Sequence, residues 1–203
     1  MTKTKVPREA ALSVAEELII LLQDSCERIQ VAGSIRRKAP MVSDVELLTI
    51  PKTKIKEVPM LGYTEKIPYD ALTARLTGLM EKDTGAAPVL AKRPNKNGGV
   101  TFGPKNKLLT HLATGIAVDI FTTTHENWGM GLMVRTGPAE WNVAIMQKFK
   151  KMGMRGHAYG GVTGSLGNEM ECPTEERVFE LLNMSYIPPE HRARIQAYSK
   201  RPQ

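Results

Sequence analysis

Apolar residues near the start of the chain follow the period of an amphipathic helix. Between residues 8 and 28 they recur every three or four positions, the spacing of one helix face, and Pro7 precedes them at a place suited to a first turn. The strand-like run 29–32 follows and is stopped by Gly33-Ser34, after which residues 35–37 can begin a short helix. The pattern therefore predicts a helix, a strand, a glycine-serine turn and a second short helix.

Two further strands and two further helices are predicted downstream. Prolines and alternating acidic residues mark a strand at 44–50, and a run of apolar residues marks another at 116–122. Residues 69–81 have helical composition, and apolar residues four positions apart predict a helix at 139–152. Helices and strands are thus mixed along the chain.

The segments between these elements are predicted to be connections or turns. The stretch 51–68 is rich in lysine and proline and is expected to be a connection, and the basic segment 92–107 is expected to be exposed and able to contact phosphate. The glycine cluster 160–167 could form a phosphate loop, but no apolar helix follows it closely, so hairpin turns are the better interpretation. Thr174 is placed to cap a last helix.

Composition and charge narrow the class of protein. The 203 residues are 41% hydrophobic and 24% charged, as in globular proteins with a real core. No apolar stretch reaches the roughly 18 to 20 residues that span a bilayer, and no signal peptide is apparent, so we expect no membrane partner and a cytoplasmic location. Cys26 and Cys172 fit neither a disulfide framework nor a zinc site. The net charge of +7 favours a polyanionic partner such as nucleic acid.

Three acidic residues form the most informative constellation. Asp44 and Glu46 are two apart in a predicted strand, so both carboxylates point to one face with no basic residue between them. Mg²⁺ suits such a pair because it takes hard oxygen ligands. Asp119, in the second predicted strand, would complete a site for two ions about 3.5 to 4 Å apart, the arrangement used for in-line phosphoryl transfer.

A glycine-serine turn precedes these acids. Gly33-Ser34 ahead of a short helix presents backbone N–H groups and a hydroxyl to phosphate oxygens, and Arg37 adds a fixed charge. Purely structural interpretations also exist: Ser34 can be a helix N-cap, and Asp44 with Glu46 can be a solvated strand end. The turn and the acids together favour a phosphate-transfer site.

Five motifs, in this order, resemble those of the family X DNA polymerases, which have the nucleotidyltransferase fold. The motifs are Gly33-Ser34-Ile35-Arg36-Arg37, Asp44-Val45-Glu46, Val118-Asp119-Ile120, Arg135-Thr136-Gly137-Pro138 followed by Asn142, and a C-terminal segment at 173–192. The first motif alone indicates a nucleotidyltransferase, whereas the last two point to family X.

The resemblance implies a role for each matched residue. Asp44, Glu46 and Asp119 would bind two Mg²⁺ ions, or Mn²⁺ in their place, and Asp119 would also activate the primer 3′ hydroxyl. Arg36 and Glu175 match a pair that joins palm and thumb when the enzyme closes. The residues implied to bind the incoming nucleotide are Gly33, Ser34, Arg37, Ser43, Gly137 and Asn142.

The resemblance also implies a fold and a function. We expect an α+β protein with a nucleotidyltransferase palm of mixed sheet and helices at 1–126 and a small α/β thumb at 127–203. Only one helix precedes Gly33, so the lyase domain of larger family members is expected to be absent. The implied partners are nucleoside triphosphates and a DNA primer or gapped DNA, bound by a monomer.

The implied activity is template-directed gap filling or end repair by a DNA polymerase. Two alternatives remain open from the sequence. One is a template-independent terminal transferase, or a transferase acting on RNA or a small molecule. The other is a non-catalytic protein that binds DNA ends.

Four positions depart from the family pattern. Glu46 stands where the polymerases usually have Asp, and Val134 and Arg135 stand where aromatic residues usually precede the Thr-Gly turn. Phe121 occupies the place of an arginine, so an aromatic residue and a cation have exchanged places between palm and thumb. We therefore expect Arg135 to act as a switch that pairs with Glu46 or Asp119 before nucleotide binds; otherwise it would face solvent or a DNA phosphate.

Overall fold

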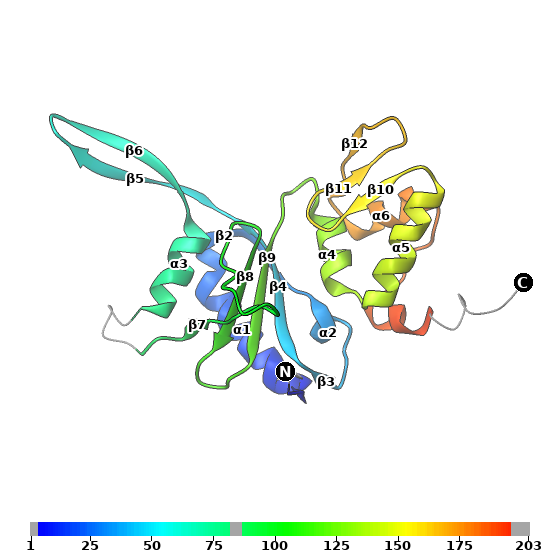
Figure 1. Cartoon of the computed structure of the whole chain (residues 1–203), viewed down its shortest axis with the longest axis horizontal. Coiled ribbons are helices and arrows are strands. Elements are labelled where there is room, and N and C mark those ends of the chain that lie inside the picture. The colour runs from blue at the N-terminus through cyan, green and yellow to red at the C-terminus, as the bar shows by residue number, and fades with distance from the viewer. Residues whose placement is uncertain (1–3, 82–86, 196–203) are drawn as a thin grey trace, which may run out of the picture.

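Two units follow one another in the computed structural model, which describes residues 4–81 and 87–195 (Figure 1). The first, which we call the palm, spans residues 4–122 and is built on a five-stranded sheet. The second, the thumb, spans residues 128–195 and combines helices with a three-stranded sheet. This is the α+β architecture that the sequence predicted.

The palm sheet is mixed, with a parallel pair at its centre. Its strands are β2 (Cys26–Val31), β4 (Asp44–Pro51), β7 (Leu90–Lys92), β8 (Asn106–His111) and β9 (Ala117–Thr122). The order across the sheet is β2-β4-β9-β8-β7, and only β4 and β9 run parallel among these neighbours. The two strands that carry the predicted carboxylates are therefore direct neighbours.

Two helices cover one face of this sheet. They are α1 (Arg8–Leu22) and α3 (Ala71–Met80), and their apolar sides pack into one core with the palm strands. The helix α1 follows Pro7 as predicted but ends earlier than residue 28, because η1 (Gln23–Ser25) turns the chain into β2. Asp70 caps α3 by accepting a hydrogen bond from the backbone N–H of Thr73 at 3.0 Å.

The opposite face of β4 carries the acids. Val45 and Leu47 are buried in the core with α1, so Asp44 and Glu46, which alternate with them, project from the other face. Farther along that face, Leu48 packs with residues of α4 (Trp128–Thr136). This face is thus polar where β4 begins and apolar where α4 covers it.

Short elements complete the palm. The helix α2 (Gly33–Arg36) follows β2, and β1 (Val6–Pro7) pairs with β3 (Met41–Val42). The order of strand, glycine-serine turn and short helix agrees with the sequence prediction.

The segment 51–68 is a long β-hairpin, so the expected connection was wrong. The strands β5 (Thr53–Met60) and β6 (Tyr63–Asp70) pair antiparallel along their whole length, and Figure 1 shows the hairpin projecting from the palm. Most of both strands is exposed. Because neither face is buried, no alternation of apolar and polar residues marks these strands in the sequence.

The segment 92–107 is only partly exposed, so that expectation needs correction. The turn at Asn97-Gly98 is exposed as expected, but Lys107 is fully buried in β8. Its ammonium group donates to the carbonyl of Gly103 at 3.0 Å and lies 5.7 Å from the ring of Phe102. A hydrogen bond and an aromatic face together compensate for the loss of water around this cation.

The thumb packs three helices and a small sheet around its own core. Its elements are α4, α5 (Ala139–Lys151), β10 (Arg155–His157), β11 (Gly161–Thr163), β12 (Glu169–Met170), α6 (Glu175–Leu181) and the 3-10 helix η2 (Pro189–Ile195). Trp141, Ile145 and Phe149 of α5 are buried as their spacing predicted, and Thr174 caps α6. The glycine cluster lies in the β11–β12 hairpin, whereas α4 was not predicted. Within the described residues, no helix is both long enough and apolar enough to cross a membrane.

Candidate active site

Parallel pairing of β4 and β9 brings the three predicted carboxylates together. Glu46 lies opposite Asp119 in the register of the two strands, and Asp44 is two residues before Glu46 on the same face. Adjacent strands are about 4.8 Å apart, so the three side chains start from neighbouring backbone positions. Pairing of distant strands has therefore assembled the acidic cluster.

The turn at the start of α2 closes around Glu46. Gly33 has a φ of +61°, and a Cβ atom at this position would collide with the Glu46 carboxylate. The N–H of Ala32 donates to the backbone carbonyl of Glu46 at 2.8 Å, which fixes the turn to β4. Glycine is needed at position 33 both for its backbone conformation and for this close approach. Ser34, in α2, and Ser43, directly before Asp44, are each half-buried in the same region of the chain.

Burial and like charge both disfavour ionisation of Glu46. Burial raises the pKa of Glu46 to about 7, and the charges of Asp44 and Asp119 act in the same direction. Arg37 and Arg135 oppose the shift without cancelling it. The acidic cluster is therefore under electrostatic repulsion that a bound cation would relieve.

Arg93 holds the third carboxylate. This residue directly follows β7, and its Nη2 donates to Oδ1 of Asp119 while its Nε donates to the carbonyl of Leu109 at 3.3 Å. Among the residues that the structure describes, no three acidic, histidine or cysteine side chains are arranged as a metal site. A cation that uses Oδ1 of Asp119 would have to replace the Arg93 contact.

The turn between α4 and α5 meets the palm beside the acids. Arg37 donates to the carbonyl of Thr136, and its Nη1 lies next to Gly137. Asn142 of α5 donates from Nδ2 to the carbonyl of Val134 at 2.7 Å. Three of the residues predicted to contact nucleotide therefore converge on one turn, where Arg37 and Asn142 hold the backbone.

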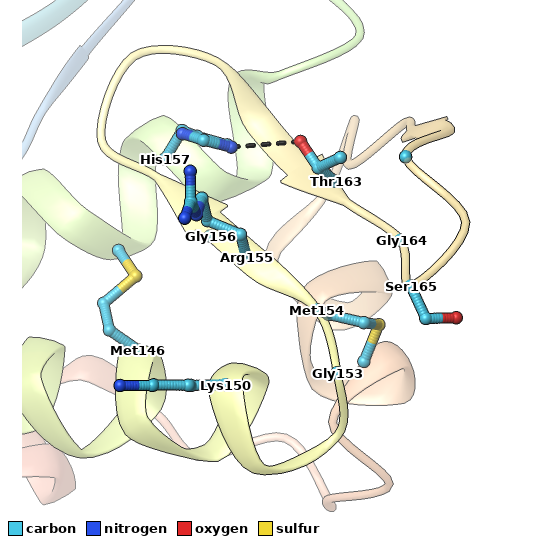
Figure 2. A pocket seen from close by; sticks show the side chains of 11 residues that line it. Met146, Lys150, Gly153, Met154, Arg155, Gly156, His157, Thr163, Gly164 and Ser165 are labelled. Atoms are coloured by element: carbon cyan, nitrogen blue, oxygen red, sulfur yellow. Dashed lines mark hydrogen bonds between the residues drawn. The ribbon is translucent and has the colours of Figure 1, made fainter.

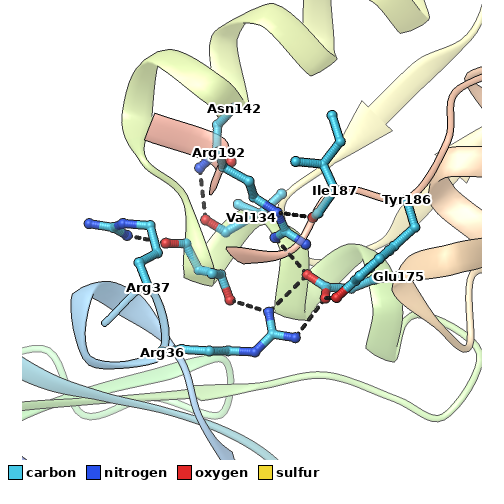
Figure 3. A network of polar contacts seen from close by, with 9 residues as sticks. Arg36, Arg37, Val134, Asn142, Glu175, Tyr186, Ile187 and Arg192 are labelled. Carbon is cyan, nitrogen blue, oxygen red and sulfur yellow. Dashed lines mark hydrogen bonds and ion pairs between the residues drawn. The ribbon is translucent and has the colours of Figure 1, made fainter. Parts of the chain in front are cut away.

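A buried ionic network joins palm and thumb (Figure 3). Arg36 binds Glu175 through two hydrogen bonds, of 3.0 Å to Oε1 and 2.6 Å to Oε2, and also donates to Thr136 Oγ1 at 2.8 Å. Arg192 donates to Glu175 Oε1 at 2.8 Å, and Tyr186 lies 3.4 Å from Oε2. Burial alone would raise the pKa of Glu175, but the hydrogen bonds from Arg36 and Arg192 outweigh it and lower the pKa. The pair of Arg36 and Glu175 is formed as expected, whereas its part in closing the enzyme stays a prediction.

Arg135 stacks between two aromatic rings. Its guanidinium lies 3.8 Å from the ring centroid of Phe121 and 4.4 Å from that of Tyr159. Arg93 contacts Asp119, and the expected switch, in which Arg135 pairs with Glu46 or Asp119 before nucleotide binds, stays a prediction. Two aromatic faces suit the planar, weakly hydrated guanidinium. Arg135 still acts on Glu46 through its charge, which lowers the pKa of that carboxyl group.

A hollow lies in the thumb, between α5 and the strands β10 and β11 (Figure 2). It has a volume of roughly 660 Å³, and its wall includes Lys150, Arg155 and His157. His157 Nε2 lies 3.0 Å from the hydroxyl of Thr163. No acidic side chain occurs among the described residues of this wall, so the hollow favours an anion.

Known proteins resemble both units of the molecule. Residues 131–193 match the family model of the DNA polymerase beta thumb. The structure of Leishmania infantum polymerase beta in a ternary P/T complex matches 93% of this chain and 77% of its own, with a TM-score of 0.59 and 19% sequence identity. The fold is that of polymerase beta. A search of curated proteins finds no match.

The polymerase beta fold and thumb confirm the resemblance drawn from the sequence motifs. Three residues of the candidate site were nevertheless missed by sequence reasoning. Arg93 belongs to the segment 92–107, which was expected to be exposed. Arg192 belongs to the C-terminal motif, but no function was assigned to it from the sequence. No motif in the sequence marks Tyr159, because its role depends only on its contact with Arg135 in the folded protein.

Proposed function

We propose that the chain is a metal-dependent nucleotidyltransferase that transfers a nucleotide from a nucleoside triphosphate to a DNA 3′ hydroxyl. The observation that carries this proposal is the parallel register that sets Glu46 beside Asp119, with Asp44 on the same face. The Gly33 turn lies against these acids, and the polymerase beta thumb is joined to the turn by Arg36 and Arg37.

The acidic cluster fits divalent metal ions by its chemistry. Carboxylates are the ligands that Mg²⁺ takes in phosphate-transfer sites, and Mn²⁺ accepts the same set. The raised pKa of Glu46 supports this fit, because a cation would offset the repulsion from Asp44 and Asp119. Asp44, Glu46 and Asp119 would hold the ions, which supply a Lewis acid for the phosphoryl oxygens when bound.

The other residues of the site would position the substrates. Asp119 would accept the proton of the 3′ hydroxyl, since a carboxylate can act as a general base. Backbone N–H groups of the Gly33 turn, with Ser34, Ser43 and Arg37, would bind the triphosphate. Gly137 and Asn142 would contact the sugar and base of the nucleotide, and Asn142 Oδ1 is buried with no hydrogen-bond partner in the described structure.

A polyanionic substrate is supported by charge. The chain has a net charge of +7, and the hollow in the thumb is lined by Lys150, Arg155 and His157. Such cations bind phosphates and release counterions, which gives salt-dependent affinity for nucleic acid. The thumb hollow would therefore bind the backbone of the DNA.

Primer extension tests the proposed function. A labelled DNA primer is incubated with Mg²⁺ and either deoxyribonucleotides or ribonucleotides, on a gapped template and without a template. We expect extension that depends on the metal and the template, because the thumb that matches the chain is that of a DNA polymerase. Extension without a template would replace this activity by terminal transfer, and the absence of any product under all conditions would contradict nucleotidyl transfer.

A further inference from the structure

The β5–β6 hairpin has no role in the site described above. Its two strands pair with each other from Thr53↔Asp70 to Met60↔Tyr63 and project from the palm (Figure 1). An isolated two-stranded hairpin is marginally stable in water. A projecting arm of this length is therefore expected to gain stability from a binding partner.

The two faces of the hairpin differ in charge. Residues that pair directly across an antiparallel ladder share a face. We call one face the basic face; it carries Lys54, Lys56, Val58, Met60, Tyr63, Glu65, Ile67 and Tyr69. Neither Lys54 nor Lys56 lies within 4 Å of an acidic side chain in the described structure, whereas Lys66, on the other face, lies 3.7 Å from Glu57. Two lysines of the basic face are thus available for a ligand, and Glu65, its single acid, lies nearer the tip.

The tip of the hairpin is apolar and exposed. Met60, Leu61 and Tyr63 have exposed fractions of 46%, 102% and 62%, and Ile55 lower on the arm is 65% exposed. Apolar side chains at the end of a β-ribbon can enter a groove of duplex DNA, while lysines behind them contact phosphates. The combination of an apolar tip with unpaired lysines favours nucleic acid over an apolar protein surface.

The basic face borders a hollow at the base of the hairpin. Lys56 and Tyr69 line a hollow at the base of the hairpin together with Gly103 and Pro104. The next residue, Lys105, has its ammonium group 5.9 Å from the ring of Tyr159, on which Arg135 stacks. Residues 102–105 therefore lead from the base of the hairpin to the ring of Tyr159, on which Arg135 stacks.

We propose that the β5–β6 hairpin is an arm that binds double-stranded DNA behind the primer end. This inference rests on the proposed function, because it needs DNA in the active site. The residues of β4 from Glu46 to Pro51 span about 17 Å, and each strand of the hairpin spans about 27 Å. At about 3.4 Å per base pair, the arm reaches the duplex from about 5 to about 13 base pairs behind the primer end.

The thumb lies on the other side of the palm from the hairpin (Figure 1). A duplex that leaves the active site toward the hairpin would be bound at one end by thumb and palm and farther back by the arm. The hairpin would therefore contribute to affinity for long duplexes and leave the chemical step unchanged.

A comparison of stem-loop primers with short and long stems tests this arm. Stems of about 4 and about 16 base pairs are titrated by fluorescence anisotropy with wild type and with the double variant Lys54→Ala/Lys56→Ala. We expect about tenfold weaker binding of the long stem by the variant, with a salt dependence reduced by about two phosphate contacts. Affinity for the short stem and the rate of single-nucleotide addition to it should match wild type.

Two further variants make the outcome decisive. Lys66→Ala removes one positive charge from the opposite face and should bind the long stem within about twofold of wild type. Leu61→Ser tests the apolar tip and should weaken long-stem binding several-fold, with circular dichroism confirming that each variant is folded. Equal affinity of wild type and the double variant for the long stem would overturn the DNA-binding arm, and so would equal losses from Lys66→Ala.

The failure of the arm and of the proposed function can be told apart. If wild type extends primers but the hairpin variants bind long stems normally, only the arm is refuted. If wild type neither binds nor extends either primer, the proposed function fails and the arm fails with it.

Discussion

Arg93 donates a hydrogen bond to Oδ1 of Asp119, so a palm cation holds the third carboxylate of the proposed site. Its neighbour in the parallel register, Glu46, has no arginine within hydrogen-bond distance among the described contacts, and burial raises its pKa to about 7. Two adjacent carboxylates therefore differ in how their charge is balanced: Asp119 is ion-paired, whereas the raised pKa of Glu46 favours its neutral form. Both the ion pair of Asp119 and the protonation of Glu46 would compete with the binding of a metal ion.

Removal of Arg93 should favour metal binding. Arg93→Ala is expected to tighten Mg²⁺ binding in the absence of nucleotide by about tenfold, equivalent to about 1.4 kcal/mol, because Asp119 loses its competing cation. Isothermal titration calorimetry measures the change. Lys92→Ala, which removes an exposed charge from the preceding position, is the control and should bind Mg²⁺ like wild type.

Neutralisation of Asp119 should abolish nucleotide addition. In Asp119→Asn an amide can neither balance the metal charge nor accept the proton of the 3′ hydroxyl, so activity should fall to less than a few per cent of wild type. Single-turnover primer extension in Mg²⁺ measures the loss, and Asp24→Asn, at an exposed position, serves as the control. A folded Asp119→Asn protein with substantial activity would contradict the role given to Asp119.

The raised pKa of Glu46 makes the stability of the metal-free protein depend on pH. The pKa of Glu46 is about 7 in the folded protein and near the ordinary glutamate value of 4.5 in the unfolded chain, so the folded state holds the proton more tightly. Stability is therefore lost as the pH rises from about 4.5 to about 7, by roughly 3 kcal/mol when complete. Glu46→Gln mimics the protonated form and should be more stable than wild type at pH 8 but not at pH 4.5.

Denaturant unfolding at the two pH values checks this expectation. Glu16→Gln, at an exposed position on α1, should show no such difference. Added Mg²⁺ should stabilise wild type at pH 8 more than Glu46→Gln, because the ion binds the ionised carboxylate. Equal stability of wild type and Glu46→Gln across this pH range would show that folding does not raise the pKa of Glu46.

The buried network between palm and thumb should be sensitive to the loss of one partner. Glu175→Gln leaves Arg36 and Arg192 without their carboxylate, and Arg192 is only 1% exposed. Removing one partner of a buried ion pair destabilises a protein by about 3 to 5 kcal/mol. Thermal unfolding measures the effect, and Glu176→Gln at the exposed neighbouring position should change stability by less than about 0.5 kcal/mol.

The thumb hollow should contribute to DNA affinity. Arg155→Ala is expected to weaken binding of a primer-template by threefold to tenfold and to reduce the salt dependence by about one phosphate contact. Anisotropy titrations over a range of salt concentrations measure both quantities. Lys151→Ala removes an exposed cation outside the wall of the hollow and is the matched control, so equal losses for the two variants would indicate general charge rather than a site.

The sequence by itself determined the local chemistry of this protein. The alternation of Asp44 and Glu46 in a strand, the glycine-serine turn before them and the apolar stripe of α5 depend on residues close together in the chain, so their periodicity could be read directly. The motif order then indicated a palm and thumb, and the fold and thumb comparisons agree.

Only the tertiary structure decided which groups meet the carboxylates. Arg93 reaches Asp119 through the pairing of β7 with β8 and of β8 with β9, and Arg135 stacks between the rings of Phe121 and Tyr159, which come from palm and thumb. The β5–β6 hairpin could not be predicted from the sequence, because a ribbon exposed on both faces has no regular pattern of apolar residues. Contacts between distant segments depend on strand pairing and packing, and these are set by the free energy of the whole fold rather than by local sequence.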